Sequence, residues 1–183
     1  MLKKEENLLG KKEFNGIQFF RKYILHFNDT FIRLYYTNVK QVDGNRSNLH
    51  ANLCIIHGFG HHSGFFLEMA YELAKQGINC HLIDLRSHGF SGGSRFDFTI
   101  EQLHQDIITL IKQAESDMPE LPLYIFGHSM GGGLVSSLFI NNQYLQIHGI
   151  ILSSPLLGFP KNVDIDAGKM FFMSKFGGTM KVK

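Results

Sequence analysis

Short apolar runs alternate along the chain with segments whose apolar residues recur at helical spacing. Near the start, residues 18–27 and 31–39 are rich in aromatic and β-branched residues and flank the pair Asn28 and Asp29. This pattern is typical of two strands joined by a turn, so we expect an antiparallel hairpin. The continuous apolar run at residues 53–56 predicts a strand that is buried on both faces.

Two later segments have the apolar spacing of amphipathic helices. Gly77 is the expected end of the first helix, and Thr99 with Gln102 forms the expected capping box at the start of the second. The expected buried positions are Phe66, Met69, Ala70, Leu73 and Ala74 in the first helix and Ile100, Leu103, Ile107, Leu110 and Ile111 in the second.

Strands and helices alternate over the rest of the chain. Apolar runs at residues 78–85, 123–126 and 149–152 predict three more strands, and a helix ending near residue 140 is expected between the last two. Such alternation is typical of parallel strands joined by right-handed helical crossovers. The chain therefore predicts an α/β fold with a mostly parallel sheet flanked by helices.

Composition narrows the class of protein. The chain has 183 residues, 44% of them hydrophobic and 19% charged, with a net charge of +2. These values fit one folded domain and give no basis for a nucleic-acid partner. Cys54 and Cys80 lie in apolar strand-like runs and are expected to be buried free thiols. The charged N-terminus resembles no signal peptide, so we expect a cytoplasmic protein, with peripheral membrane contact left open.

The most informative motif is GHSMG at residues 127–131, which follows the apolar run 123–126 and precedes a predicted helix. A serine between a buried strand and a helix is typical of a nucleophile elbow, a sharp turn that exposes the hydroxyl group. The flanking glycines allow the strand and the helix to approach closely. We therefore expect Ser129 to project from this turn beside the positive end of a helix dipole.

Three segments with unusual residues follow predicted parallel strands: residues 57–62, 84–93 and 127–131. In open α/β sheets, ligands bind at the carboxyl ends of the strands. These segments should therefore meet on one side of the sheet.

Four blocks together resemble a known family: HGFGHHSG at residues 57–64, DLRSHGFSGG at 84–93, GHSMGG at 127–132 and SSPL at 153–156. The chain resembles the α/β hydrolases, and within them the monoacylglycerol lipase and lysophospholipase-like group, also called serine aminopeptidase-like. The resemblance covers about residues 20 to 160.

The resemblance implies that Ser129 is the nucleophile and that the backbone N–H groups of Phe59 and Met130 form the oxyanion hole. Two fixed donors would stabilise the negative charge that develops when an alkoxide attacks an ester carbonyl. The chain departs from the family at Phe59, where a small residue is common, and at His61, where an acidic residue is common. These departures bear on the shape of the acyl pocket. No cofactor and no metal is expected.

Other residues suggest sites that we consider weaker. Asp84 and His88 are four residues apart and could form a dyad, but the family uses this glycine-rich segment as a structural turn. His57, His61 and His62 could suggest a metal cluster, although they lack the helical spacing and the carboxylate of a zinc motif. His128 is expected to pack beneath the elbow.

The base and the acid of a catalytic triad are harder to find. In this fold both follow the serine, the acid first and the histidine second. After Ser129 the chain has only His148, Asp164 and Asp166 as candidates, and His148 precedes both aspartates. His148 also begins a strand whose neighbour ends at Ser129, so about 15 to 20 Å should separate the two residues.

We therefore expect an N-terminal tail at residues 1–16, an incomplete hydrolase core at 17–160 and the start of a lid at 161–183. One functional hypothesis is a serine hydrolase that releases fatty acid from monoacylglycerol or lysophospholipid, with peptidase, thioesterase and acyltransferase variants open. The other is a catalytically inactive, truncated relative that binds a lipid or a partner. Phe171, Phe172, Met173 and Phe176 would line an acyl entrance, touch a membrane or be core residues without their partners.

Overall fold

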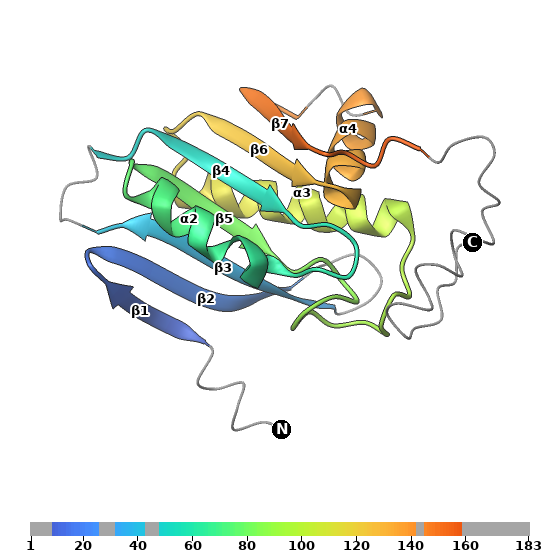
Figure 1. Cartoon of the computed structure of the whole chain (residues 1–183), viewed down its shortest axis with the longest axis horizontal. Helices are drawn as coiled ribbons and strands as arrows, with labels where there is room; N and C mark the ends of the chain where they lie inside the picture. The colour runs from blue at the N-terminus through green and yellow to red at the C-terminus, as the bar shows by residue number, and fades with distance from the viewer. Residues whose placement is uncertain (1–8, 26–31, 43–47, 142–144, 159–183) are drawn as a thin grey trace.

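The computed structural model describes residues 9–25, 32–42, 48–141 and 145–158, and its strands form one sheet (Figure 1). The strands are β1 (Gly10–Phe14), β2 (Ile17–Leu25), β3 (Arg33–Gln41), β4 (Ala51–Ile56), β5 (Ile78–Ile83), β6 (Leu123–His128) and β7 (Gly149–Ser153). The helices are η2 (Ser63–Phe66), α2 (Leu67–Ala74), α3 (Ile100–Asp117) and α4 (Met130–Asn141). The order across the sheet is β1-β2-β3-β5-β4-β6-β7.

The sheet has a parallel part and an antiparallel part. Strands β5, β4, β6 and β7 pair in parallel, as the alternation of strands and helices predicted. Strand β3 pairs antiparallel with both β5 and β2, and the β2–β3 pair confirms the predicted hairpin. The α/β prediction is confirmed, and the parallel part carries the elbow at the end of β6.

Each face of the sheet has its own apolar core, because side chains alternate between faces along a strand. Figure 1 shows α2 in front of the sheet and α3 behind it. In β4, Leu53 and Ile55 pack with α2, whereas Cys54 and Ile56 pack with α3 and α4. Burial on both faces explains why the parallel strands read as continuous apolar runs.

Three further expectations concern the cysteines, the termini and the membrane. Cys54 and Cys80 are buried free thiols, as predicted. Strand β1 lies within the segment 1–16 that we expected to be a tail, and it pairs with β2 through the ladder from Gly10 to Phe14. The expected lid at 161–183, with Asp164, Asp166 and the aromatic residues near 171–176, lies outside the described residues. No helix among the described residues is long and apolar enough to cross a membrane.

Helix α3 confirms its predicted capping box and corrects one predicted core position. The Gln102 N–H donates to the Thr99 hydroxyl, and the Thr99 N–H donates to the Gln102 side chain. Leu103, Ile107, Leu110 and Ile111 are buried, but Ile100 is 57% exposed. Helical spacing fixes the direction of a side chain but not how far the sheet extends along the helix, and Ile100 is in the first turn.

This difference can be tested with two isoleucines of the same helix. Ile107→Ala should lower the free energy of unfolding by about 2 to 5 kcal/mol, because it leaves a cavity beneath the sheet. Ile100→Ala should lower it by less than about 1 kcal/mol, because its side chain is largely in water. Urea unfolding followed by circular dichroism measures both, and equal losses would contradict the burial described here.

Candidate active site

Ser129 occupies a sharp turn between β6 and α4. Strand β6 ends at His128, α4 begins at Met130, and Ser129 between them has a φ of 52°. Positive φ is uncommon for a residue with a side chain and marks local backbone strain. The Ser129 N–H donates to the Ser153 carbonyl at 2.9 Å, and the Ser129 carbonyl accepts from the Leu156 N–H at 2.8 Å. The segment after β7 therefore holds the strained residue in place.

Glycines on both sides of Ser129 allow this turn to close. A Cβ on Gly127 would lie 2.8 Å from the Gly131 carbonyl oxygen, and a Cβ on Gly131 would lie 2.6 Å from the carbonyl oxygens of Ile56 and His57. Both positions leave no room for a side chain, because the neighbouring atoms belong to the backbone. The predicted reason for these glycines, close approach of strand and helix, therefore applies at both positions.

The loop after β4, residues 57–62 (the β4 loop), lies directly beside Ser129. A Cβ on Gly58 would be 3.1 Å from the Cβ of Ser129, and Phe59 is the next residue. Met130 opens α4, and the first N–H groups of a helix have no partner within the helix. The Phe59 ring stacks on Phe96, with 4.7 Å between ring centroids, so this side chain belongs to an aromatic cluster in the neighbouring loop.

His57 fastens the β4 loop to the loop after β5. Its Nδ1 lies 2.7 Å from the Gly58 carbonyl oxygen, and its Nε2 lies 3.0 Å from the Leu85 nitrogen. The Leu85 N–H can only donate, so Nε2 accepts and the proton is on Nδ1. Burial, and secondly the nearby His88, lower the pKa of His57 to about 3. The ring is therefore a neutral structural link.

The segment 84–93 is a structural turn, as the resemblance implied. The Asp84 carboxylate accepts from the Ser63 N–H at 2.7 Å and from the Phe90 N–H at 2.9 Å. Nδ1 of His88 lies 2.9 Å from the Arg86 carbonyl oxygen, and burial lowers the pKa of His88. The oxygens of Asp84 are thus engaged by backbone groups, which argues against an Asp84–His88 dyad.

Sequence reasoning missed Asp106, which pairs with Arg86 inside the protein. The Arg86 guanidinium donates to the Asp106 carboxylate at 2.6 Å, and the backbone N–H of Arg86 donates to the same carboxylate at 2.9 Å. Both side chains are buried. A buried charge is costly unless it is paired and hydrogen-bonded. The available signal was an aspartate between Leu103 and Ile107 on the apolar face of a predicted helix.

The structure brings His61 and His128 together near the elbow but places His148 far from it. The rings of His61 and His128 are nearly parallel with centroids 6.0 Å apart, and Nδ1 of His128 lies 3.2 Å from the Ser153 hydroxyl oxygen. Burial and the neighbouring His128 lower the pKa of His61. His148 accepts from the Leu123 N–H at the opposite end of β6. Among the described residues, no histidine hydrogen-bonds to the Ser129 hydroxyl.

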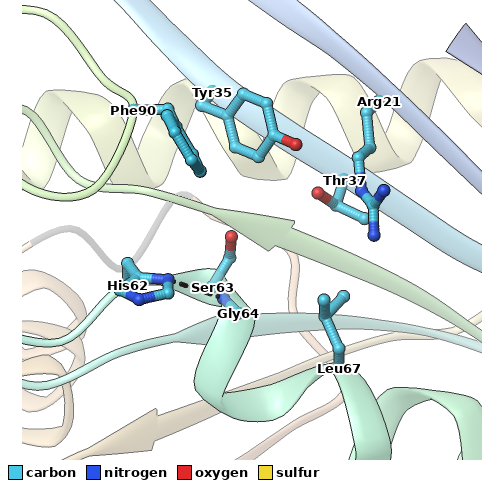
Figure 2. A pocket seen from close by; sticks show the side chains of 8 residues that line it. All are labelled: Arg21, Tyr35, Thr37, His62, Ser63, Gly64, Leu67 and Phe90. Atoms are coloured by element: carbon cyan, nitrogen blue, oxygen red, sulfur yellow. Dashed lines mark hydrogen bonds between the residues drawn. The ribbon is translucent and has the colours of Figure 1, made fainter. Parts of the chain in front are cut away.

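The described residues contain a cavity close to the loop after β4 but no candidate metal site. Within them, no group of three His, Cys, Asp or Glu side chains is arranged to hold a metal ion. A cavity of about 110 Å³ lies beside the β4 loop, and Figure 2 shows Arg21, Tyr35, Thr37 and Ser63 around it. Ser129 does not line this cavity.

Comparison with known proteins agrees with this geometry. The model of the family described as serine aminopeptidase, S33, matches residues 47–182. The chain belongs to this family. Its elbow, β4 loop and 84–93 turn all lie within the matched segment.

Similar sequences include three relatives of this serine aminopeptidase-family chain. An uncharacterized abhydrolase domain-containing protein of Dictyostelium discoideum is 33% identical over 71% of this chain and 13% of its own length. A monoacylglycerol lipase of Mycolicibacterium smegmatis is 37% identical over 44% of this chain and 29% of its own length. A monoglyceride lipase of Rattus norvegicus is 32% identical over 58% of this chain and 35% of its own length. The chain thus spans at most about a third of these relatives.

Similar solved structures show the α/β-hydrolase fold of this family member. A soluble variant of monoglyceride lipase from Saccharomyces cerevisiae aligns with a TM-score of 0.66 and 20% identity, over 92% of this chain and 52% of that one. A carboxyl esterase from Bacillus coagulans aligns with a TM-score of 0.65 and 24% identity, over 73% of this chain and 43% of the esterase. The family model and the monoacylglycerol lipase relatives, together with this fold, confirm the resemblance stated from the motifs.

The buried neutral histidines of this family member predict acid sensitivity. Burial lowers the pKa values of His57 and His81 to about 3, below the ordinary value of 6.5. Between these values the unfolded chain binds protons that the folded chain does not, so stability falls as the pH falls from 6.5 towards 3. Each histidine should contribute up to about 1.4 kcal/mol per pH unit.

The measurement is the free energy of urea unfolding at several pH values for the wild type and His57→Gln. The variant should be less stable at pH 7, because the link to Leu85 is weakened, and its stability should fall less steeply on acidification. An identical pH slope in the two proteins would contradict the burial of a neutral His57.

Proposed function

We propose that this protein is a serine hydrolase of carboxylic esters with Ser129 as its nucleophile. The observation that carries the proposal is the positive φ of Ser129 at a strand-to-helix turn, directly beside the loop after β4. This arrangement is typical of a nucleophile elbow. The family membership supports the same chemistry.

In the proposed reaction the Ser129 oxygen attacks the carbonyl carbon of an ester and forms a tetrahedral intermediate. The N–H groups of Phe59 and Met130 donate to its negative oxygen, which makes that charged state less costly. The bond to the alkoxy oxygen then breaks, this oxygen takes the proton that was removed from the serine hydroxyl and leaves as the alcohol, and an acyl group remains on Ser129. Water then attacks the acyl carbon, releases the carboxylic acid and restores the serine.

This chemistry requires a base that takes the proton of the serine hydroxyl. A serine is a weak nucleophile without a histidine in hydrogen-bond reach. The described residues supply no such histidine, and His148 is the last one in the sequence. We therefore propose hydrolysis for a polypeptide that includes a histidine able to reach Ser129.

The proposed substrates are monoacylglycerols or lysophospholipids. The similarity to a bacterial monoacylglycerol lipase and to a rat monoglyceride lipase supports an acylglycerol. Two apolar side chains near the elbow, Phe65 and Leu157, are exposed. Phe65 stacks on His61, and Leu157 follows Leu156, whose N–H donates to the Ser129 carbonyl. These side chains suit an acyl chain and contact with a lipid surface that delivers it. Peptidase, thioesterase and acyltransferase activities are alternatives.

A second proposal applies to the 183-residue chain by itself. Because no described histidine hydrogen-bonds to the Ser129 hydroxyl, this polypeptide would bind a lipid or a partner without turning it over. Removing the base of a serine triad leaves only residual catalysis from the oxyanion hole and from binding.

A fluorophosphonate probe distinguishes the two proposals. We expect a polypeptide that joins this chain to a histidine able to reach Ser129 to be labelled and its Ser129→Ala variant to be unlabelled, because the probe forms a covalent bond with an activated serine. Ser136→Ala is the matched control on α4 and should keep the label. Labelling is read by gel fluorescence and mass spectrometry of the modified peptide.

Each result has a clear meaning. Serine-dependent labelling of the 183-residue chain would rule out the inactive binder and require a base among its own residues. Labelling that persists in Ser129→Ala would contradict Ser129 as the nucleophile. Absence of label both from the 183-residue chain and from the polypeptide that includes the histidine would contradict the hydrolase proposal.

A further inference from the structure

Three lysine side chains lie close together on the antiparallel part of the sheet, away from Ser129. Lys11 is opposite Phe20 in the β1–β2 ladder, and Lys40 is opposite Gln18 in the β2–β3 ladder. Lys22 is two residues from Phe20 along β2, so all three lysines lie on the same face of three adjacent strands. Phe20 packs with the core beneath α3, which identifies this face.

The end of α3 closes the lysines into a pocket. A cavity of about 210 Å³ is lined by the three lysines and, from α3, by Gln113 and Asp117. The Lys22 ammonium donates to the Gln113 side-chain oxygen at 2.9 Å, and the Lys40 ammonium contacts Asp117 at 3.3 Å. The ammonium groups thus come from three strands to one cavity beside the helix.

Positive charge exceeds negative charge around this cavity. Three lysines and one aspartate line it, which leaves two positive charges in excess. Burial opposes ionisation of Asp117, but Lys40 and the Asn79 amide outweigh it and hold the pKa of Asp117 below its ordinary value. The aspartate is therefore ionised and offsets Lys40. Lys11 and Lys22 have no carboxylate partner among the described residues, although Glu13 lies on the same face of exposed β1.

The floor of the cavity is a buried polar network. The Tyr36 hydroxyl is 2.7 Å from Nδ1 of His81, and the Asn38 amide donates to Asn79 at 2.7 Å. Asn79 in turn donates to Asp117 at 3.3 Å. Because buried polar groups are positioned by their partners, this floor holds the side chains around the cavity in fixed places.

We propose that this lysine pocket binds a ligand bearing a phosphate group. A phosphate carries up to two negative charges and several acceptor oxygens, which match two uncompensated ammonium groups and the donors of the cavity. The pocket is separate from the elbow, because β3, β5 and β4 lie between β2 and β6. At the usual spacing of strands, about 19 Å separates β2 from β6.

Equilibrium dialysis with labelled inorganic phosphate tests the proposal at constant ionic strength, with chloride as the competing anion. Lys11→Gln and Lys22→Gln should each weaken phosphate binding about tenfold, the loss expected for one charged hydrogen bond. Lys12→Gln is the matched control, because it removes the same charge from β1 on the opposite face. Lys12→Gln should bind phosphate like the wild type.

A melting curve without phosphate shows whether each variant is folded. Lys11 is exposed and makes no hydrogen bond among the described residues, so Lys11→Gln stays informative even where Lys22→Gln loses its bond to Gln113. Absence of phosphate binding by the wild type, or an equal loss in Lys12→Gln, would overturn the proposal.

The source of the phosphate is found with vesicles of phosphatidylcholine with and without phosphatidic acid. Binding only to vesicles that contain phosphatidic acid, lost in Lys11→Gln and kept in Lys12→Gln, would assign the group to a lipid headgroup. Binding of inorganic phosphate without vesicle binding would assign it to a soluble ligand. Both results support the pocket, and neither depends on Ser129.

Discussion

The contact between the start of α4 and the end of β4 is the constraint on which the candidate active site depends. At Gly131 the helix approaches the Ile56 and His57 carbonyl oxygens so closely that a Cβ would lie 2.6 Å from each. This approach brings the helix start and the β4 loop to the same place, beside Ser129. The strained φ of Ser129 is maintained by hydrogen bonds from its N–H to the Ser153 carbonyl and from the Leu156 N–H to its carbonyl.

The neighbouring loops are held by buried polar groups rather than by apolar packing alone. Asp84 accepts from the Ser63 N–H at the start of η2, His57 accepts from the Leu85 N–H, and the Arg86–Asp106 pair connects the 84–93 turn to α3. Each of these groups would be costly to bury without its partner. The parallel strands bring the loops to one edge, while the antiparallel strands beyond β5 carry the separate lysine pocket.

Much of this arrangement follows from local sequence patterns. The apolar runs predicted β4 and β6, the Thr99–Gln102 box predicted the start of α3, and GHSMG predicted the turn at Ser129. The exposure of Ile100 and the pairing of β1 depend on where other elements end, which periodicity does not specify. The Arg86–Asp106 pair joins residues 20 positions apart, and the lysine pocket requires the register of three strands. Such information is absent from any single segment.

A pair of glycine substitutions tests whether α4 touches the β4 backbone at Gly131. Alanine is favoured over glycine inside a helix by about 1 kcal/mol, so Gly131→Ala would stabilise a helix that had free space around it. We predict instead that Gly131→Ala lowers the free energy of unfolding by about 1 to 3 kcal/mol, because backbone atoms must move. Gly158→Ala, where a Cβ meets open space, should change it little. An unchanged or increased stability of Gly131→Ala in urea unfolding would contradict this account.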